Sequence, residues 1–148
     1  MVRLKTTESG RNFIKKEEGI RLIAYNDGVN IYTIGIGHTG YVDGIKIKPG
    51  MKITKEKAEA LFIEDLSKIE EVINNAVIVP LNQNQFDALV SLVFNIGGGN
   101  FRKSTLLRKL NVKDYKGSAE QFLAWKYAGG KPILLSRRLR EQAVFVRK

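Results

Sequence analysis

The stretch that decides the fold runs from Glu18 to Gly40 and reads EGIRLIAYNDGVNIYTIGIGHTG. It follows a short helical pattern over residues 13–17, and Gly19 stands where a C-cap glycine is expected. The sequence therefore predicts that Glu18 is held at the end of a helix.

Beyond this helix end, the sequence predicts a β-hairpin. Residues 20–25 are rich in strand-forming side chains, an Asn-Asp-Gly turn signal follows, and residues 29–36 alternate into a second strand. Asp27 and Thr33 lie about 20 Å apart in an extended chain, so only a chain reversal lets them face one centre. Together with Glu18 they supply two carboxylates and a hydroxyl, which suit protonation of a glycosidic oxygen and positioning of a water molecule.

Each of these three residues also has a purely structural interpretation. A glutamate near a helix end is usually solvated, and an aspartate in Asn-Asp-Gly usually serves the turn. A strand threonine is common wherever a strand is half-buried. The three residue types alone do not establish a catalytic site.

The spacing of Glu18, Asp27 and Thr33 within this stretch resembles the active-site segment of the phage-type lysozymes, the endolysin muramidases of glycoside hydrolase family 24. Four further blocks resemble family segments in the same order, so the resemblance covers nearly the whole chain. They are LNQNQFDALVS at 81–91, VFNIG at 93–97, STLLRKLN at 104–111 and SRRLRE at 136–141.

The resemblance implies a mostly helical α+β lysozyme-like fold in one domain spanning residues 1–148. A small β-containing lobe at about 18–55 would be joined by a long helix at about 55–76 to a helical lobe at about 80–148, with the cleft between the lobes.

The resemblance also implies hydrolysis of the β-1,4 bond between N-acetylmuramic acid and N-acetylglucosamine in peptidoglycan, with inversion and without a cofactor. Glu18 would be the general acid, while Asp27 would stay ionised and hold the attacking water with Thr33.

Supporting roles are implied for three more residues. His38 is similar to a family histidine that pairs with an aspartate on the long helix, and Asp65 matches that aspartate. Arg137 aligns with an arginine near the catalytic glutamate. The alternatives are a general-base role for His38 and a solvated basic helix face for Arg137.

Substrate contacts are implied for Thr39, Phe94 and Asn95, which match cleft-lining positions of the family. For Phe94, a place in the hydrophobic core is an equally good interpretation.

Outside these blocks, the pattern predicts a short strand at 45–47 and a long amphipathic helix begun by the N-cap Thr54. A buried helix over 86–96 is then predicted, capped by Asn82 and stopped by the glycines at 97–99. Three short helices follow in the prediction, at 104–110, 117–126 and 136–147, with N-caps at Ser104, Ser118 or Asp114, and Ser136.

The composition argues against two classes of wall-degrading enzyme. The 148 residues contain no cysteine and one histidine, which argues against a zinc amidase or a cysteine peptidase. The net charge of +10 lies wholly in residues 100–148, which hold 13 basic and 3 acidic side chains. Such a surface attracts polyanions, including anionic polymers of the bacterial envelope.

No signal peptide and no membrane span are expected, since the first residues lack an apolar run. The prediction is a monomer kept in the host cytoplasm, with no metal and no specific nucleic acid partner. The family resemblance implies that it reaches the wall after a phage holin opens the membrane.

Three other functions remain open from the sequence. A lytic transglycosylase would cut the same bond with one glutamate, and Asp27 and Thr33 argue against it. A nucleic-acid-binding module would explain the basic C-terminal third but not the N-terminal spacing. A membrane-disrupting role for the basic helices could coexist with catalysis.

Overall fold

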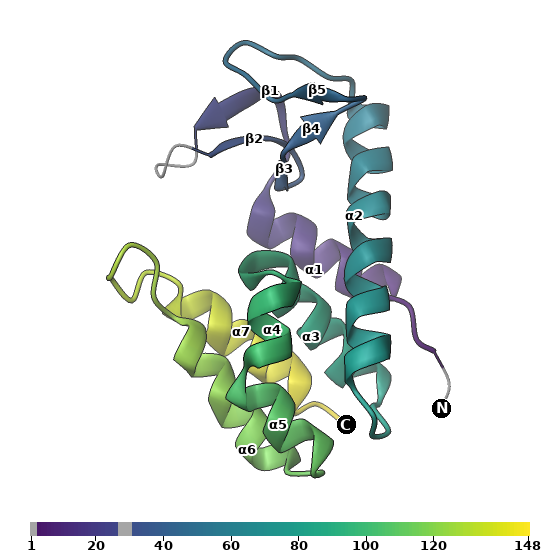
Figure 1. Ribbon diagram of the computed structural model, residues 1–148, viewed down its shortest axis with the longest axis vertical. Helices are drawn as coiled ribbons and strands as arrows, with labels where there is room; N and C mark the ends of the chain where they lie inside the picture. Colours follow the sequence, from purple (N-terminus) through teal and green to yellow (C-terminus); the bar gives the residue numbers. More distant parts are fainter. Residues whose placement is uncertain (1–2, 27–30) are drawn as a thin grey trace. The chain divides into compact units, whose positions relative to one another are not determined.

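The computed structural model describes residues 3–26 and 31–148 (Figure 1). Its elements combine helices with two small antiparallel sheets, which agrees with the predicted α+β class. In chain order they are α1 (Glu8–Glu18), β1 (Arg21–Asn26), β2 (Tyr32–Gly35), β3 (His38–Thr39), β4 (Tyr41–Val42), β5 (Ile45–Lys46), α2 (Lys55–Ala76), α3 (Gln83–Ile96), α4 (Gly98–Lys103), α5 (Thr105–Asn111), α6 (Tyr115–Gln121), the 3₁₀ helix η1 (Phe122–Trp125) and α7 (Leu135–Phe145).

The chain divides into two compact units. The first unit comprises residues 14–67 and carries the sheets, and the second unit comprises residues 1–13 with 68–148. These boundaries differ from the predicted lobes because the first turns of α1 belong with the C-terminal helices, and because α2 is shared between the units.

Hydrogen bonds explain why the N-terminal residues belong to the second unit. The N–H and hydroxyl of Thr6 both donate to Glu70 Oε2, at 2.7 and 2.6 Å. The N–H of Thr7 donates to Asp87 Oδ1 at 3.1 Å, and its hydroxyl donates to Asp87 Oδ2. The two residues before α1 are thus tied to α2 and α3. The Thr7 hydroxyl also accepts a hydrogen bond from the Gly10 N–H at 3.0 Å, which satisfies one of the unpaired amide groups in the first turn of the helix. Gly10 permits this approach, since a Cβ there would lie 2.6 Å from the Asp87 carboxyl carbon.

In the first unit, a three-stranded antiparallel sheet has the order β1-β2-β3, and β4 pairs with β5. The predicted hairpin is confirmed, with Asn26 opposite Tyr32. Beneath it lies a small apolar core. Its members are Ile34, Val42, Ile47 and Leu61, with Ala24, Tyr32, Met51 and Ile53 packed against them.

The second unit is organised around α3, on which all residues from Phe86 to Val93 are buried. The predicted cap is confirmed, because Asn82 and Gln85 form a reciprocal capping box at 2.7 and 2.8 Å. Helix α3 packs against α7, and α5 packs against α6 (Figure 1). The predicted cap of α2 is also present, with the Lys57 N–H donating to Thr54 Oγ1 at 3.0 Å.

The predicted end of the buried helix is confirmed, since Gly97 follows Ile96 with φ of 89°. Gly98 and Gly99, which were expected to belong to the same break, begin α4 instead. Two other details of the prediction are wrong. Ser136 lies inside α7, which begins after Leu134 without a side-chain cap. The helix expected over 117–126 is α6 followed by the tighter η1, and Asp114 caps α6 through the Gly117 N–H at 2.8 Å.

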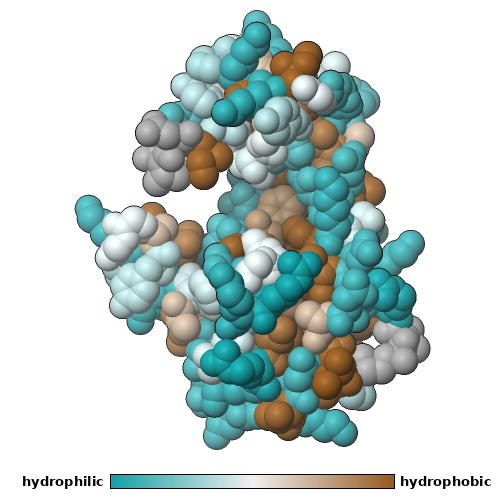
Figure 2. All heavy atoms as spheres, in the orientation of Figure 1, coloured by the Kyte–Doolittle hydropathy of each residue, from teal (hydrophilic) through white to brown (hydrophobic). Residues whose placement is uncertain are grey.

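On the face drawn in Figure 2, hydrophilic side chains predominate and apolar side chains form separate patches. Within the part of the chain that the structure describes, no helix is both long and apolar enough to cross a membrane.

Candidate active site

Glu18 occupies the last position of α1, where the sequence places it. Gly19 follows with φ of 72°, and its N–H donates to the Lys15 carbonyl at 2.8 Å. One turn earlier, Lys15 Nζ lies 2.9 Å from a Glu59 carboxylate oxygen on α2 and 5.7 Å from the Phe62 ring centroid. These contacts fix the turn that carries Glu18, which is itself partly exposed.

Thr33 lies in the central strand of the three-stranded sheet and is 5% exposed. In the register of the sheet it faces Tyr25 on β1 and Thr39 on β3. Directly opposite residues of antiparallel strands project from the same face. The structure therefore brings Thr33 and Thr39 together, with the exposed Thr39 at the rim.

Asp27 lies outside the described residues, so its role stays a prediction. The chain reversal that this prediction requires is present, because Asn26 and Tyr32 pair across β1 and β2.

His38 and Asp65 form the pair that the resemblance implies, with His38 Nδ1 2.7 Å from Asp65 Oδ2. The other ring nitrogen, Nε2, lies 2.7 Å from the Tyr41 carbonyl oxygen. Both nitrogens thus face acceptors, and only the imidazolium donates from both. The hydrogen bond to Asp65 raises the pKa of His38 above 6.5, the Tyr41 carbonyl and the nearby carboxylates of Asp65 and Glu64 act in the same direction, and burial opposes them.

Asp65→Asn is expected to lower the pKa of His38 and to remove a pH dependence of stability. Because the folded state raises this pKa, the pair stabilises the protein fully below pH 6.5, and this stabilisation is lost as pH rises through the folded pKa. The variant should lose about 1–3 kcal/mol of unfolding free energy at low pH, less at high pH, and little activity. NMR titration of His38 and denaturant unfolding against pH would measure this.

Asp43→Asn is the matched control, because Asp43 pairs with Lys57 at the surface. An unchanged His38 titration curve in Asp65→Asn would contradict the predicted coupling.

The remaining predicted site residues belong to the second unit. Phe94 is partly exposed at the end of α3, and Asn95 beside it is exposed, so Phe94 is not a fully buried core residue. Arg137 is 7% exposed, and its interpretation as a solvated surface cation is therefore wrong.

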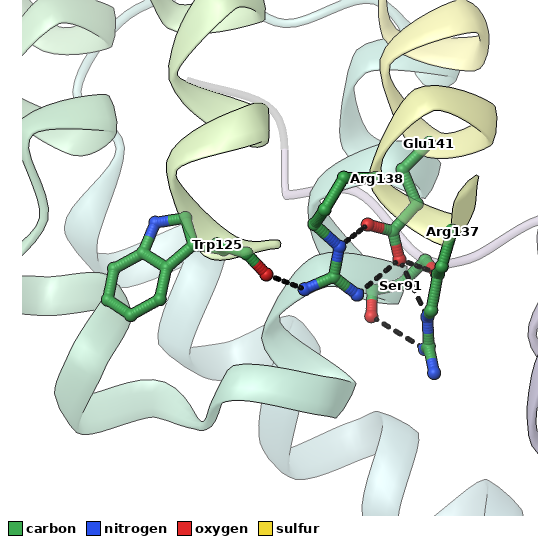
Figure 3. A network of polar contacts seen from close by, with 5 residues as sticks. All are labelled: Ser91, Trp125, Arg137, Arg138 and Glu141. Atoms are coloured by element: carbon green, nitrogen blue, oxygen red, sulfur yellow. Dashed lines mark hydrogen bonds and ion pairs between the residues drawn. The ribbon is translucent and has the colours of Figure 1, made fainter. Parts of the chain in front are cut away.

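Arg137 is part of a buried polar network that the sequence interpretation missed (Figure 3). Its Nε donates to Glu141 Oε2 at 3.1 Å, and its Nη2 donates to the Ser91 carbonyl at 3.1 Å. Arg138 Nε lies 2.8 Å from Glu141 Oε1, and Arg138 Nη1 donates to the Trp125 carbonyl at 3.3 Å. The network links α3, η1 and α7.

Glu141 is fully buried at the centre of this network. Burial raises the pKa of Glu141, while Arg138, Arg137 and the Ser91 hydroxyl oppose that rise by stabilising the carboxylate. The spacing of Glu141 three and four residues after two arginines is the signal that could have predicted these ion pairs.

Two other features of the structure carry no catalytic group. A cavity of about 610 Å³ in the second unit is lined by Arg3, Leu4, Ile73–Asn75 and Val77–Leu81, without an acidic side chain. Among residues 3–26 and 31–148, no three histidine or acidic side chains are grouped as metal ligands would be.

Comparison with known proteins assigns the class. The model of the phage lysozyme family, described as "Phage lysozyme", matches residues 15–141. The chain belongs to this family.

Close relatives agree with this assignment. The chain is 53% identical over 144 residues to an endolysin of Salmonella phage P22, covering 97% of this chain and 99% of the relative. A crystal structure of a single-residue mutant of P22 lysozyme superposes with a TM-score of 0.83 at 52% identity, covering 97% and 99% of the two chains. The muramidase domain of SpmX from Asticaccaulis excentricus superposes with a TM-score of 0.85 at 37% identity, covering 99% and 100%.

The fold is therefore that of the phage lysozymes, as the resemblance implied. The chain is an enzyme, a glycosidase of the muramidase type that acts on peptidoglycan.

Proposed function

We propose that the chain hydrolyses the β-1,4 bond between N-acetylmuramic acid and N-acetylglucosamine, and so lyses the host wall for phage release. Glu18 gives a proton to the leaving oxygen. Asp27, as the carboxylate, stabilises positive charge on the sugar and holds the attacking water with Thr33. In this proposal the enzyme meets the wall after a holin has opened the membrane.

One observation carries the proposal. Glu18, at the fixed end of α1, and Thr33, in the central strand, belong to the same compact unit, and the chain reverses between β1 and β2. This arrangement supports a site built from a carboxylic acid and a water-binding hydroxyl. The matching family model supports the same chemistry.

Product analysis tests the reaction. Purified peptidoglycan is digested with the enzyme, and the released fragments are analysed by mass spectrometry. Hydrolysis adds one water molecule at each cut, whereas a lytic transglycosylase gives an anhydro product of unchanged total mass. Anhydro products would contradict the proposal and favour the transglycosylase.

Thr33→Ala is expected to lower the turnover rate by up to about tenfold, since one hydrogen bond to water is lost. Thr33→Ser retains the hydroxyl and should stay close to wild type. Because Thr33 is buried, denaturant unfolding must accompany the kinetics. A loss as large as that of a Glu18 variant, in a folded protein, would mean that Thr33 has a different role.

A further inference from the structure

We propose that Arg21, held over the ring of Tyr25, binds a carboxylate of the peptide stems of peptidoglycan. The inference rests on the proposed function and adds to it a contact outside the scissile sugars. It assigns a substrate-binding role to β1, for which the sequence interpretation had only a strand.

The first observation is the position of the pair. Arg21 and Tyr25 both lie on β1, and the Arg21 guanidinium carbon is 4.9 Å from the Tyr25 ring centroid. Tyr25 is opposite Thr33, which in turn is opposite Thr39. The pair therefore continues the sheet face that carries Thr33 and Thr39.

The second observation is the positive charge of Arg21. Arg21 is exposed, and within residues 3–26 and 31–148 no carboxylate forms an ion pair with it. Contact with an aromatic ring offsets part of the cost of holding the side chain still. Its N–H donors remain able to pair with a planar anion.

The chemistry of the substrate selects the partner. Where a peptide stem is attached, the lactyl carboxyl group of N-acetylmuramic acid is bound in an amide, so the sugars offer hydroxyl and amide groups and the free carboxylates belong to the stems. A guanidinium donates two parallel N–H bonds to a carboxylate, a match that a neutral hydroxyl does not provide. Arg21 would thus favour peptide-bearing strands over uncharged glycans with the same backbone linkage.

The test compares two forms of one substrate. Soluble, uncross-linked peptidoglycan strands are used with their stem carboxylates free, and after these carboxylates have been converted to amides. On the acidic strands, Arg21→Gln should raise KM about three- to tenfold with little change in kcat, as for an exposed to partly desolvated ion pair. On the amidated strands, wild type and Arg21→Gln should have the same KM.

Two further variants test whether the change in KM comes from the Arg21 guanidinium or from positive charge in general. Lys48→Gln removes one exposed positive charge from the same unit and should leave the KM ratio of the two substrates at the wild-type value. Arg21→Lys keeps the charge but loses the planar fork, so its KM should lie between wild type and Arg21→Gln.

The inference is overturned if Arg21→Gln changes KM equally on both substrates, or on neither. Anhydro products from the wild type, in contrast, would contradict the proposed hydrolysis itself. The two failures are therefore distinguishable in the same set of assays.

Discussion

Glu18→Gln is expected to lower the rate of peptidoglycan hydrolysis by about 10²–10⁴-fold, because glutamine cannot supply a proton to the leaving oxygen. The substitution preserves the size of the side chain at the end of α1. Gly19 and the Lys15–Glu59 pair, which fix this turn, are untouched. The free energy of unfolding should therefore stay close to wild type. Turbidity loss of wall suspensions, together with denaturant unfolding, measures both quantities.

The matched control is Glu8→Gln, which makes the same chemical change in the first turn of the same helix. It should lyse walls at the wild-type rate. Substantial wall lysis by folded Glu18→Gln would remove Glu18 from the role of general acid. If instead bacteria are killed by Glu18→Gln without fragments being released, the basic C-terminal third has a membrane-disrupting activity of its own.

Glu141→Gln is expected to destabilise the protein by about 3–5 kcal/mol, the usual cost of breaking a buried ion pair by removing one partner. Glu141 and Arg138 are fully buried, and Arg137 nearly so. Without the carboxylate, both buried guanidinium groups lose their ion pair with Glu141. Thermal and denaturant unfolding would measure the loss, and Glu120→Gln, an exposed site on α6, is the control.

A double-mutant cycle separates the ion pair from the packing. Arg138→Met removes one of the two charges, so the combined variant Arg138→Met/Glu141→Gln should be less destabilised than the sum of the single variants. Additive losses would mean that Glu141 acts through its shape and not through its charge.

The parts of the fold that sequence predicts well are those set by local chemistry. The end of α1 at Glu18 follows from a glycine that adopts positive φ. The starts of α2 and α3 follow from Thr54 and Asn82, whose side chains accept amide hydrogen bonds. The pairing of His38 with Asp65 came from the family resemblance, since 27 residues separate them.

The errors occur where tertiary contacts outweigh local preference. The glycines at 98 and 99 are typical of a break, yet Gly98 packs against Val72 and begins α4. Two adjacent arginines in a helix are typical of a charged surface. Arg137 and Arg138 are buried instead, and the carbonyl groups that accept their hydrogen bonds, those of Ser91 and Trp125, come from other elements. The contact of Arg21 with Tyr25 was also missed; it lies where the register of β1 against β2 is irregular.

The hydrogen bonds from Thr6 and Thr7 to Glu70 and Asp87 also determine when the start of α1 can be anchored. They join residues 64 and 80 positions apart. On a translating ribosome, Thr6 can reach Glu70 only after that part of α2 has been made, and Thr7 can reach Asp87 only after the start of α3 has been made. The residues that precede the Glu18 helix are thus anchored late in synthesis, and an interrupted chain that ends before residue 87 would lack the bonds to Asp87.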